Sequence, residues 1–236
     1  MKALNCPSCG AALPAHVVST DLASCEFCGT TFRISKTLTP EPDMGDLLLG
    51  ADFSKKIIPG WETLNPEKLT FHKNSPPELR GTFDPHTNSY YLLKSSGLWD
   101  DFDAGVNIKF TGGDKEWIRG GLYTRFSSEG GYGFLVSAQA SYTFGTFAKD
   151  NTGELVFHKI MAWTYHTALR PGFNEVNRLR VICNAGNFRI FLNGVMATSF
   201  KDEKFTMGKL YLVAEPSEKS KITIAFSDLQ LREVPK

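Results

Sequence analysis

The sequence predicts an all-β chain in which an antiparallel two-sheet sandwich follows a small unit organised by cysteines. Three observations predict this fold. Four of the five cysteines form two closely spaced pairs near the N-terminus. From about residue 51 onward, apolar residues alternate with polar ones at a period of two. No segment shows the apolar spacing of an amphipathic helix, which argues against a parallel βαβ arrangement.

The cysteine spacing predicts a metal site. Two residues separate Cys6 from Cys9, fifteen residues follow, and Cys25 and Cys28 repeat the two-residue gap. This is the spacing of four-cysteine zinc sites. Four thiolates complete a tetrahedral shell and leave no position for water, so we expect one structural Zn²⁺ per chain. A redox Cys-x-x-Cys pair is the alternative, but two such pairs at this distance favour zinc.

The residues around the cysteines suit a compact, metal-dependent unit. Gly10 and Gly29 directly follow the second cysteine of each pair, where the chain must bend sharply. Residues 13–22 suit a hairpin and residues 30–34 a closing strand. His16 could act as a surrogate ligand, although a solvated hairpin residue is the simpler interpretation. Because so small a unit has almost no core, the metal must supply most of its folding energy.

The segments CPSCG and CEFCGTTF resemble the two knuckles of a zinc ribbon, and the resemblance covers residues 1 to about 34. It implies binding of either nucleic acid or protein. Four thiolates and Zn²⁺ sum to a charge of about −2, and the nearby basic residues only cancel the nearby acidic ones. Since no basic patch remains for phosphates, docking to a protein or capping of the neighbouring domain is favoured.

Residues 35–50 contain turn formers, prolines and charges without periodicity, and we expect them to form a linker. The large domain should span residues 51–236, with about a dozen antiparallel strands in two stacked sheets. The Asn193-Gly194 step is typical of a hairpin turn. The clearest strands are expected at residues 90–94, 102–110, 118–126, 132–138, 142–147, 155–160, 179–183, 188–192, 210–214 and 222–226.

Several expected strands carry apolar residues on both faces; Leu135, for example, opposes Phe134 and Val136. Such strands should lie centrally, with one face in the core and the other partly covered or lining a groove. Cys183 follows the same pattern, and we expect a small buried apolar residue there rather than a nucleophile.

The order of several blocks resembles a known fold. The blocks are ADFSKKIIPGW, DDFDAGVNIKF, GGLYTRFSSEGGYGFLVSAQ, AWTYHTALRPGFNEVNRLRVICNAGNFRIFLNG and GKLYLVAEPSEKSKITIAFSDLQL. Over residues 51–233 they resemble a concanavalin A-like jelly roll, and more narrowly the bacterial laminin G-like modules and the 3-keto-disaccharide hydrolase group. The resemblance implies an antiparallel two-sheet jelly-roll sandwich. Members of this fold often bind sugars and some cleave glycosides, but a fold does not decide function.

The sequence shows no hydrolytic machinery. Cleavage of a glycoside needs two carboxylates about 5–10 Å apart, and the β-glucanases of this fold carry a Glu-x-Asp-x-x-Glu run on one strand. No such run occurs here, and the acidic residues fall mostly in expected turns. The five histidines are scattered, and none belongs to a His-Glu-x-x-His motif. No catalytic residue is therefore predicted.

Aromatic and basic residues on strands and loops are the candidates for ligand contact. Tyr123 and Arg125 are two residues apart and should share one face of their strand. Trp163, Tyr165 and His166 cluster in a polar stretch after an expected strand. Flat rings can stack on the C–H faces of a sugar while polar groups hold its hydroxyls. Plugging of the sandwich edge by Trp163, with Tyr165 packed beside it, is the alternative.

Calcium is the second metal for which the sequence offers a candidate site. The segment Asp-Asn-Thr-Gly-Glu at residues 150–154 offers oxygen ligands of the kind that calcium prefers. The resemblance adds that laminin G-like modules sometimes hold calcium at a sandwich rim. A plain polar turn is the alternative.

Charge and composition limit the class of function. The 26 basic and 25 acidic residues leave a net charge of +1, which disfavours an electrostatic grip on nucleic acid or an anionic membrane. The N-terminus lacks the apolar core of a signal peptide, and metal thiolates need a reducing compartment, so we expect a cytoplasmic protein.

The predicted function is that of a non-enzymatic binding or scaffold protein. Its sandwich would recognise a glycan-like or protein partner, and the zinc ribbon would dock to a protein or stabilise the neighbouring domain. A glycoside-processing hydrolase of the same fold and a nucleic-acid adaptor that uses the ribbon are the alternatives.

Overall fold

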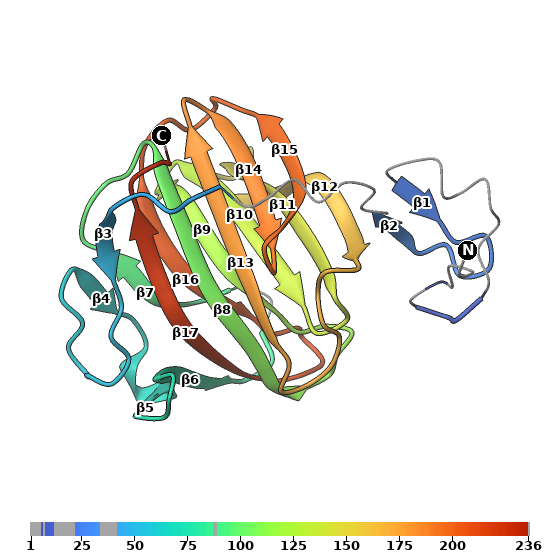
Figure 1. Cartoon of the computed structure of the whole chain (residues 1–236), viewed down its shortest axis with the longest axis horizontal. Coiled ribbons are helices and arrows are strands. Elements are labelled where there is room, and N and C mark those ends of the chain that lie inside the picture. The colour runs from blue at the N-terminus through green and yellow to red at the C-terminus, as the bar shows by residue number, and fades with distance from the viewer. Residues whose placement is uncertain (1–5, 7, 12–21, 34–41, 87–88, 236) are drawn as a thin grey trace.

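The structure is a computed structural model that describes residues 6, 8–11, 22–33, 42–86 and 89–235. Its main body consists of two large, mostly antiparallel sheets packed face to face (Figure 1). Most of the hairpin expected at residues 13–22, together with His16, lies outside the described residues. Within the described ranges, no helix has the length and apolar character needed to cross a bilayer.

The first sheet has nine strands, and all its pairings but one are antiparallel. In spatial order they are β1 (Leu22–Ser24), β2 (Thr31–Arg33), β12 (Leu155–His166), β11 (Ser141–Lys149), β10 (Gly130–Ser137), β9 (Arg119–Ser127), β16 (Lys209–Glu215), β7 (Tyr90–Ser95) and β4 (Trp61–Thr63). The exception is the parallel pairing of β2 with the end of β12, at Tyr165 and His166. This pairing joins the cysteine-containing unit to the edge of the sheet (Figure 1).

The second sheet has eight strands, and every pairing in it is antiparallel. Its main path runs through β15 (Val195–Lys201), β14 (Asn187–Leu192), β13 (Val176–Asn184), β8 (Phe102–Gly113), β17 (Ile222–Arg232), β6 (Glu78–Phe83) and β5 (Leu69–His72). Beside this path, β3 (Leu47–Gly50) pairs with β17. A 3₁₀ turn, η2 (Pro66–Lys68), precedes β5. The expected all-β sandwich of two antiparallel sheets is therefore confirmed.

The period-two alternation places the main core between the two sheets. Along β8, Phe102 and Phe110 are each 1% exposed and belong to this core. Stacked rings continue it, since the Phe200 ring centroid lies 4.4 Å from that of Phe144 and 4.8 Å from that of Phe188. Cys183 is fully buried in the same core, and burial raises the pKa of its thiol to about 11. It is the small buried apolar residue that the sequence predicts.

The Asn193-Gly194 hairpin turn is also confirmed. The two residues have φ angles of 49° and 82°, the positive values that the twist of two-residue hairpins requires. The Asn193 side chain then fastens the turn, because its Oδ1 accepts the N–H of Arg178 at 2.7 Å and its Nδ2 donates to the Ala168 carbonyl at 2.7 Å. One asparagine thus supplies both the left-handed backbone and two tertiary hydrogen bonds.

Two local expectations need correction. Residues 47–50, which we expected in the linker, form β3, and Leu49 packs against the core. The strand β12 does not end near residue 160 but continues to His166, so Trp163 and Tyr165 lie on a strand rather than after one. Two register shifts between β11 and β12 interrupt the apolar alternation, and this interruption hides the second half of the strand in the sequence.

Candidate functional site

The four N-terminal cysteines come together in the structure. The Sγ atoms of Cys6 and Cys28 lie 3.7 Å apart, as do those of Cys9 and Cys25, and all four lie within 4.8 Å of one another. A tetrahedral ion with Zn–S bonds of about 2.3 Å places its sulfurs about 3.8 Å apart, whereas a disulfide needs about 2.05 Å. The four thiols can therefore hold one metal ion. Among the described residues, they form the one cluster of metal-ligating side chains.

The two halves of this cluster repeat one backbone geometry. The Cys6 carbonyl accepts the N–H of Gly10 at 2.7 Å, and the Cys25 carbonyl accepts that of Gly29 at 2.8 Å. Both glycines have positive φ, 75° and 70°, as the expected sharp bend requires. Hydrogen bonds with the side chain and backbone of Thr30 lower the pKa of Cys28 to about 6, which favours the thiolate form that metals bind.

The outer face of the nine-stranded sheet, which turns away from the core, carries a second apolar cluster. At its centre, Tyr123, Leu135 and Val213 are at most 2% exposed, although the residues beside them in each strand face the core. The aromatic and apolar side chains packed around this centre are Tyr91, Phe126, Phe147, Leu155, Trp163 and Tyr211. We call this set the outer cluster. Leu135 is thus on a central strand with both faces covered, as expected.

The rings of the outer cluster pack against one another. The Tyr123 ring centroid lies 4.6 Å from that of Phe147 and 6.0 Å from that of Tyr91, and the Tyr91 and Tyr211 centroids lie 5.3 Å apart. Gly133 makes room for them, because a Cβ atom at this position would come within 2.9 Å of the Phe147 ring and 3.2 Å of the Tyr123 ring. The absence of a side chain at Gly133 therefore lets the rings lie close to the sheet.

A groove of ≈ 770 Å³ borders the outer cluster. Tyr91 and Phe147 belong to its apolar lining, and Arg119, Glu154 and Glu215 are its charged residues. This volume falls within the range of about 300–1,000 Å³ that is typical of small-molecule sites, as does the mixture of aromatic rings with a few polar groups.

Tyr123 holds Glu215 in place beside this groove. The buried Tyr123 hydroxyl donates a hydrogen bond to Glu215 Oε1, and the Ser89 hydroxyl donates to the same oxygen at 2.9 Å. Burial first, and then the charge of Glu215, raise the pKa of Tyr123 well above its usual value, so the phenol remains a donor. The carboxylate is thereby fixed at the groove wall, where it can accept hydrogen bonds from a ligand.

The three candidate residues on β12 do not share one environment. Trp163 and Tyr165 line a second cavity of ≈ 600 Å³ between β12 and the second cysteine knuckle. The Arg119 guanidinium lies over the Trp163 ring, 5.0 Å from its centroid. His166 is fully buried, and its Nδ1 accepts the N–H of Ala168 at 3.2 Å. His166 therefore orders the turn after β12 and does not line either cavity.

Arg125 does not share a face with Tyr123, contrary to the expectation from their spacing. Its φ of 47° lies in the left-handed region, and the register between β9 and β16 shifts between Lys209 and Tyr211. The resulting bulge makes Tyr123 and Phe126, three residues apart, both members of the outer cluster. Arg125 itself is 3% exposed.

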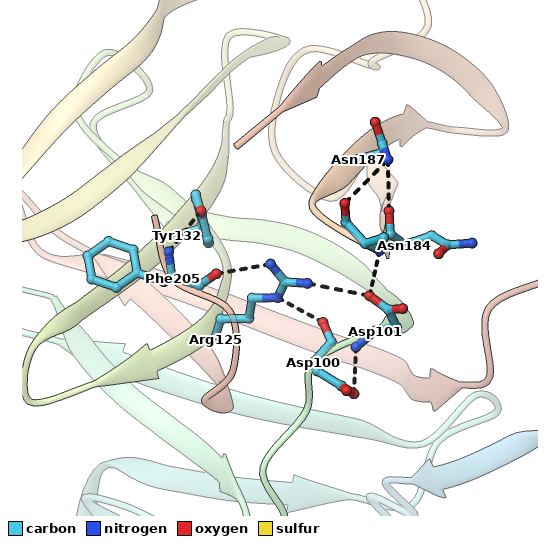
Figure 2. Close-up of polar contacts among 8 residues, drawn as sticks. Asp100, Asp101, Arg125, Tyr132, Asn184, Asn187 and Phe205 are labelled. Atoms are coloured by element: carbon cyan, nitrogen blue, oxygen red, sulfur yellow. Dashed lines mark hydrogen bonds and ion pairs between the residues drawn. The ribbon is translucent and has the colours of Figure 1, made fainter. Parts of the chain in front are cut away.

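Figure 2 shows the Arg125 guanidinium between the segment that carries Asp100 and Asp101 and the one that carries Phe205. Its Nε donates to the Asp100 carbonyl at 2.8 Å, and its Nη1 donates to the Phe205 carbonyl at 2.9 Å. The Asp101 Oδ1, 3.4 Å from Nη2, also accepts the N–H of Ala185 at 2.7 Å. The donors of Arg125 are committed to these loops, so this residue stabilises the fold instead of contacting a ligand.

The Asp150–Glu154 segment forms a turn that satisfies its own carboxylate. Asp150 Oδ1 accepts the N–H and the hydroxyl of Thr152 at 2.8 and 2.6 Å, and the N–H of Glu154 at 3.1 Å. These bonds, the Thr152 hydroxyl foremost, lower the pKa of Asp150. The geometry supports the polar-turn alternative to the calcium site.

Sequence reasoning missed Ser89, Tyr91 and Glu215 as site residues. A signal existed for Glu215, because it continues the alternation of Tyr211 and Val213 on the face opposite to the core. The sequence did not show that this face would be covered by aromatic rings from β7, β9 and β11. Pairing of distant strands decides that arrangement.

Solved structures of known proteins share this fold. The carbohydrate-binding module CBM66 from Bacillus subtilis is 19% identical, with 74% of this chain and 96% of that one covered and a TM-score of 0.53. A Bacillus subtilis protein of unknown function with a galectin-like fold is 11% identical, with 83% and 100% covered and a TM-score of 0.54. Botulinum neurotoxin type C, whose cell entry depends on two ganglioside molecules, is 11% identical, with 80% and 48% covered and a TM-score of 0.50.

These likenesses, at low sequence identity, establish a concanavalin-like jelly-roll sandwich and do not carry function across. No protein-family model matches the chain, and no curated protein matches it.

Proposed function

We propose that this protein binds a saccharide in the groove beside the outer cluster. The observation that carries the proposal is the fixed pair of Tyr123 and Glu215, which sets an oriented carboxylate beside a bed of aromatic rings. Sugars present apolar C–H faces and a rim of hydroxyls. Tyr91 and Phe147 offer rings to the faces, and Glu215 and Arg119 offer an acceptor and a donor to the hydroxyls.

The fold agrees with this proposal, since a carbohydrate-binding module is among the proteins that share it. We also propose that the sandwich is most like the laminin G-like modules within this fold. The near-neutral charge of the chain, +1, also suits an uncharged polyhydroxyl ligand better than a polyanion.

A glycan array probed with the full chain tests the proposal, followed by calorimetry on the strongest binders. Tyr91→Ala should weaken binding at least about tenfold, or about 1.4 kcal/mol, because it removes a ring from the groove. Tyr90→Ala is the matched control, since Tyr90 is the adjacent residue but packs against the main core and Phe83 instead. Absence of binding to every printed glycan, or equal losses in both variants, would overturn the proposal.

Glu215→Gln separates the role of the carboxylate from that of the rings. The amide keeps one oxygen that can accept the hydrogen bonds from Tyr123 and Ser89, but it lacks the negative charge that strengthens them. We expect weaker saccharide binding with an unchanged preference among glycans. A shift of preference without loss of affinity would contradict the proposed role.

We further propose that Cys6, Cys9, Cys25 and Cys28 hold one structural Zn²⁺. The distance of 3.7 Å from Cys6 Sγ to Cys28 Sγ, and from Cys9 Sγ to Cys25 Sγ, supports this proposal. A reducing compartment is required for such ligation, which is our reason for proposing a cytoplasmic location. Metal analysis should return one zinc per chain, and Cys25→Ser should lose it. Cys183→Ala is the matched control and should retain the metal. A metal-free chain with an ordered cysteine unit would refute the assignment.

Glycoside hydrolysis is the second candidate function, because two carboxylates, Glu154 and Glu215, line the same groove. Release of reducing ends from bound oligosaccharides tests it. Hydrolysis would have to disappear in Glu215→Gln and in Glu154→Gln. If the wild-type chain releases no reducing ends from a glycan that it binds, the protein is a binding module.

A further inference from the structure

A cleft of ≈ 600 Å³ separates the second cysteine knuckle from the sheet edge. The knuckles contribute Ser8, Gly29, Thr30 and Thr31 to its walls. The sandwich contributes the rings of Trp163 and Tyr165 and the polar side chains of Lys115, Gln139 and Ser141. The cleft therefore combines flat rings on one side with hydroxyl groups on the other, and neither unit forms it alone.

The cysteine cluster fixes the knuckle side of the cleft. The Thr30 carbonyl accepts the N–H of Cys25 at 2.9 Å, and the Thr30 hydroxyl oxygen lies 3.2 Å from Cys28 Sγ. Thr31 Oγ1 lies 3.1 Å from Ser24 Oγ across the β1–β2 pair. Since so small a unit depends on its metal for folding, the positions of Thr30 and Thr31 depend on the metal as well.

The cleft adjoins the groove through one pair of side chains. Arg119 lines the groove, Trp163 lines the cleft, and the Arg119 guanidinium lies 5.0 Å from the Trp163 ring centroid. Trp163 also packs against the outer cluster. A ligand that occupies the groove and extends past Arg119 would therefore reach the cleft.

We propose that the cleft is a second subsite for the saccharide chain bound in the groove, and that it exists only when the cysteine cluster holds its metal. The inference rests on the proposed function. Its ligand class is a neutral oligosaccharide, because the cleft offers two aromatic rings, hydroxyls and an amide, and Lys115 is the one charged side chain among the described residues of its lining. Short saccharides bind in the groove alone, whereas longer ones bind in both.

The test compares disaccharides with hexasaccharides of linear glucan, mannan, fructan and xylan series, using the full chain with zinc and after chelation. In the series that binds, the hexasaccharide should bind at least about tenfold more tightly than the disaccharide with zinc present, or about 1.4 kcal/mol. Chelation should remove this advantage and leave the disaccharide affinity unchanged. Circular dichroism and thermal unfolding confirm that the sandwich stays folded.

Variants distinguish this inference from the proposed function. Tyr165→Ala and Gln139→Ala should reduce the hexasaccharide advantage alone, because both residues line the cleft and neither lines the groove or belongs to the outer cluster. Gln139 is exposed, so its replacement leaves the core untouched. Trp117→Ala is the control, since Trp117 is 37% exposed and outside the lining of either cavity. A hexasaccharide advantage that survives chelation and Tyr165→Ala overturns the second subsite while groove binding stands. Failure of every disaccharide and hexasaccharide to bind overturns both.

Discussion

Arg180 on β13 and Asp103 on β8 form a two-point ion pair that is almost completely buried. Arg180 Nε donates to Asp103 Oδ1 at 2.8 Å and Nη2 donates to Oδ2 at 2.6 Å, with the side chains 2% and 3% exposed. The same guanidinium donates to the carbonyl of Pro42 at 3.0 Å and approaches that of Asp43 at 3.4 Å. It therefore ties the segment that leads out of the linker to the eight-stranded sheet.

Arg180→Met should destabilise the sandwich by about 3–5 kcal/mol, because it leaves the Asp103 carboxylate buried without its partner. Urea unfolding monitored by tryptophan fluorescence measures the loss. The double variant Arg180→Met with Asp103→Leu should recover a large part of it, since no buried charge remains. Equal stability of the single and double variants would show that the pair matters through the Pro42 and Asp43 contacts alone.

Acid should weaken the fold partly through Glu78, which is 7% exposed and pairs with Arg80 and Lys109. Burial raises the pKa of Glu78, but these two cations outweigh it and lower the pKa overall. The ionised Glu78 therefore stabilises the fold above its unfolded pKa of about 4.3, and this contribution disappears as the pH falls through the lower folded pKa.

Comparison of wild type with Glu78→Gln from pH 7 to pH 3 measures this contribution. The difference in free energy of unfolding should be constant near neutrality and shrink below about pH 4.3. A difference that grows on acidification would mean that the folded pKa is raised rather than lowered.

Gly133→Ala should disrupt the outer cluster, because the added methyl group would lie 2.9 Å from the Phe147 ring. We expect a stability loss of about 1–3 kcal/mol from overpacking, together with weaker saccharide binding. Gly112→Ala is the matched control on the opposite sheet, where the new Cβ would meet Thr223 at an ordinary 3.5 Å. Calorimetry and thermal unfolding of both variants give the two readouts, and unchanged binding in Gly133→Ala would remove the cluster from the site.

Arg125→Met should loosen the loops that Figure 2 shows around the guanidinium. It removes charge-assisted hydrogen bonds to the Asp100 and Phe205 carbonyls, each worth about 1.5–3 kcal/mol. Hydrogen exchange should accelerate at residues 96–101 and 202–208, while saccharide binding in the groove stays the same. Loss of binding with intact loops would reinstate Arg125 as a ligand-contacting residue.

The sequence could predict most strands of the sandwich but not all of them. Long strands such as β8 show an uninterrupted alternation of apolar and polar residues, which is the period of an extended strand. The strands β4 and β5 have three and four residues, too few for a period to be visible. The strand β3 lies in a segment rich in turn formers. Only one of its side chains, that of Leu49, packs against the core, so the sequence shows no alternation there.

The sequence indicated the surroundings of some candidate residues and not of others. Trp163 and Tyr165 were found as aromatic residues in a polar setting, and both line a cavity. Arg125 and His166 were selected by the same reasoning, yet both are buried and committed to structural hydrogen bonds. A bulge at Arg125 reversed the side on which it points, and backbone angles of this kind depend on the partner strand.

The sequence by itself determined the clustering of the four N-terminal cysteines and the fold class of this protein. Cysteine spacing allows short stretches of chain to bring four sulfurs together, and a period of two commits each strand to one buried face. Only the tertiary structure decided which outer face carries rings and which carboxylate lies among them. Tyr91, Tyr123, Phe147 and Glu215 come from four strands, and their proximity follows from long-range pairing that no local pattern records.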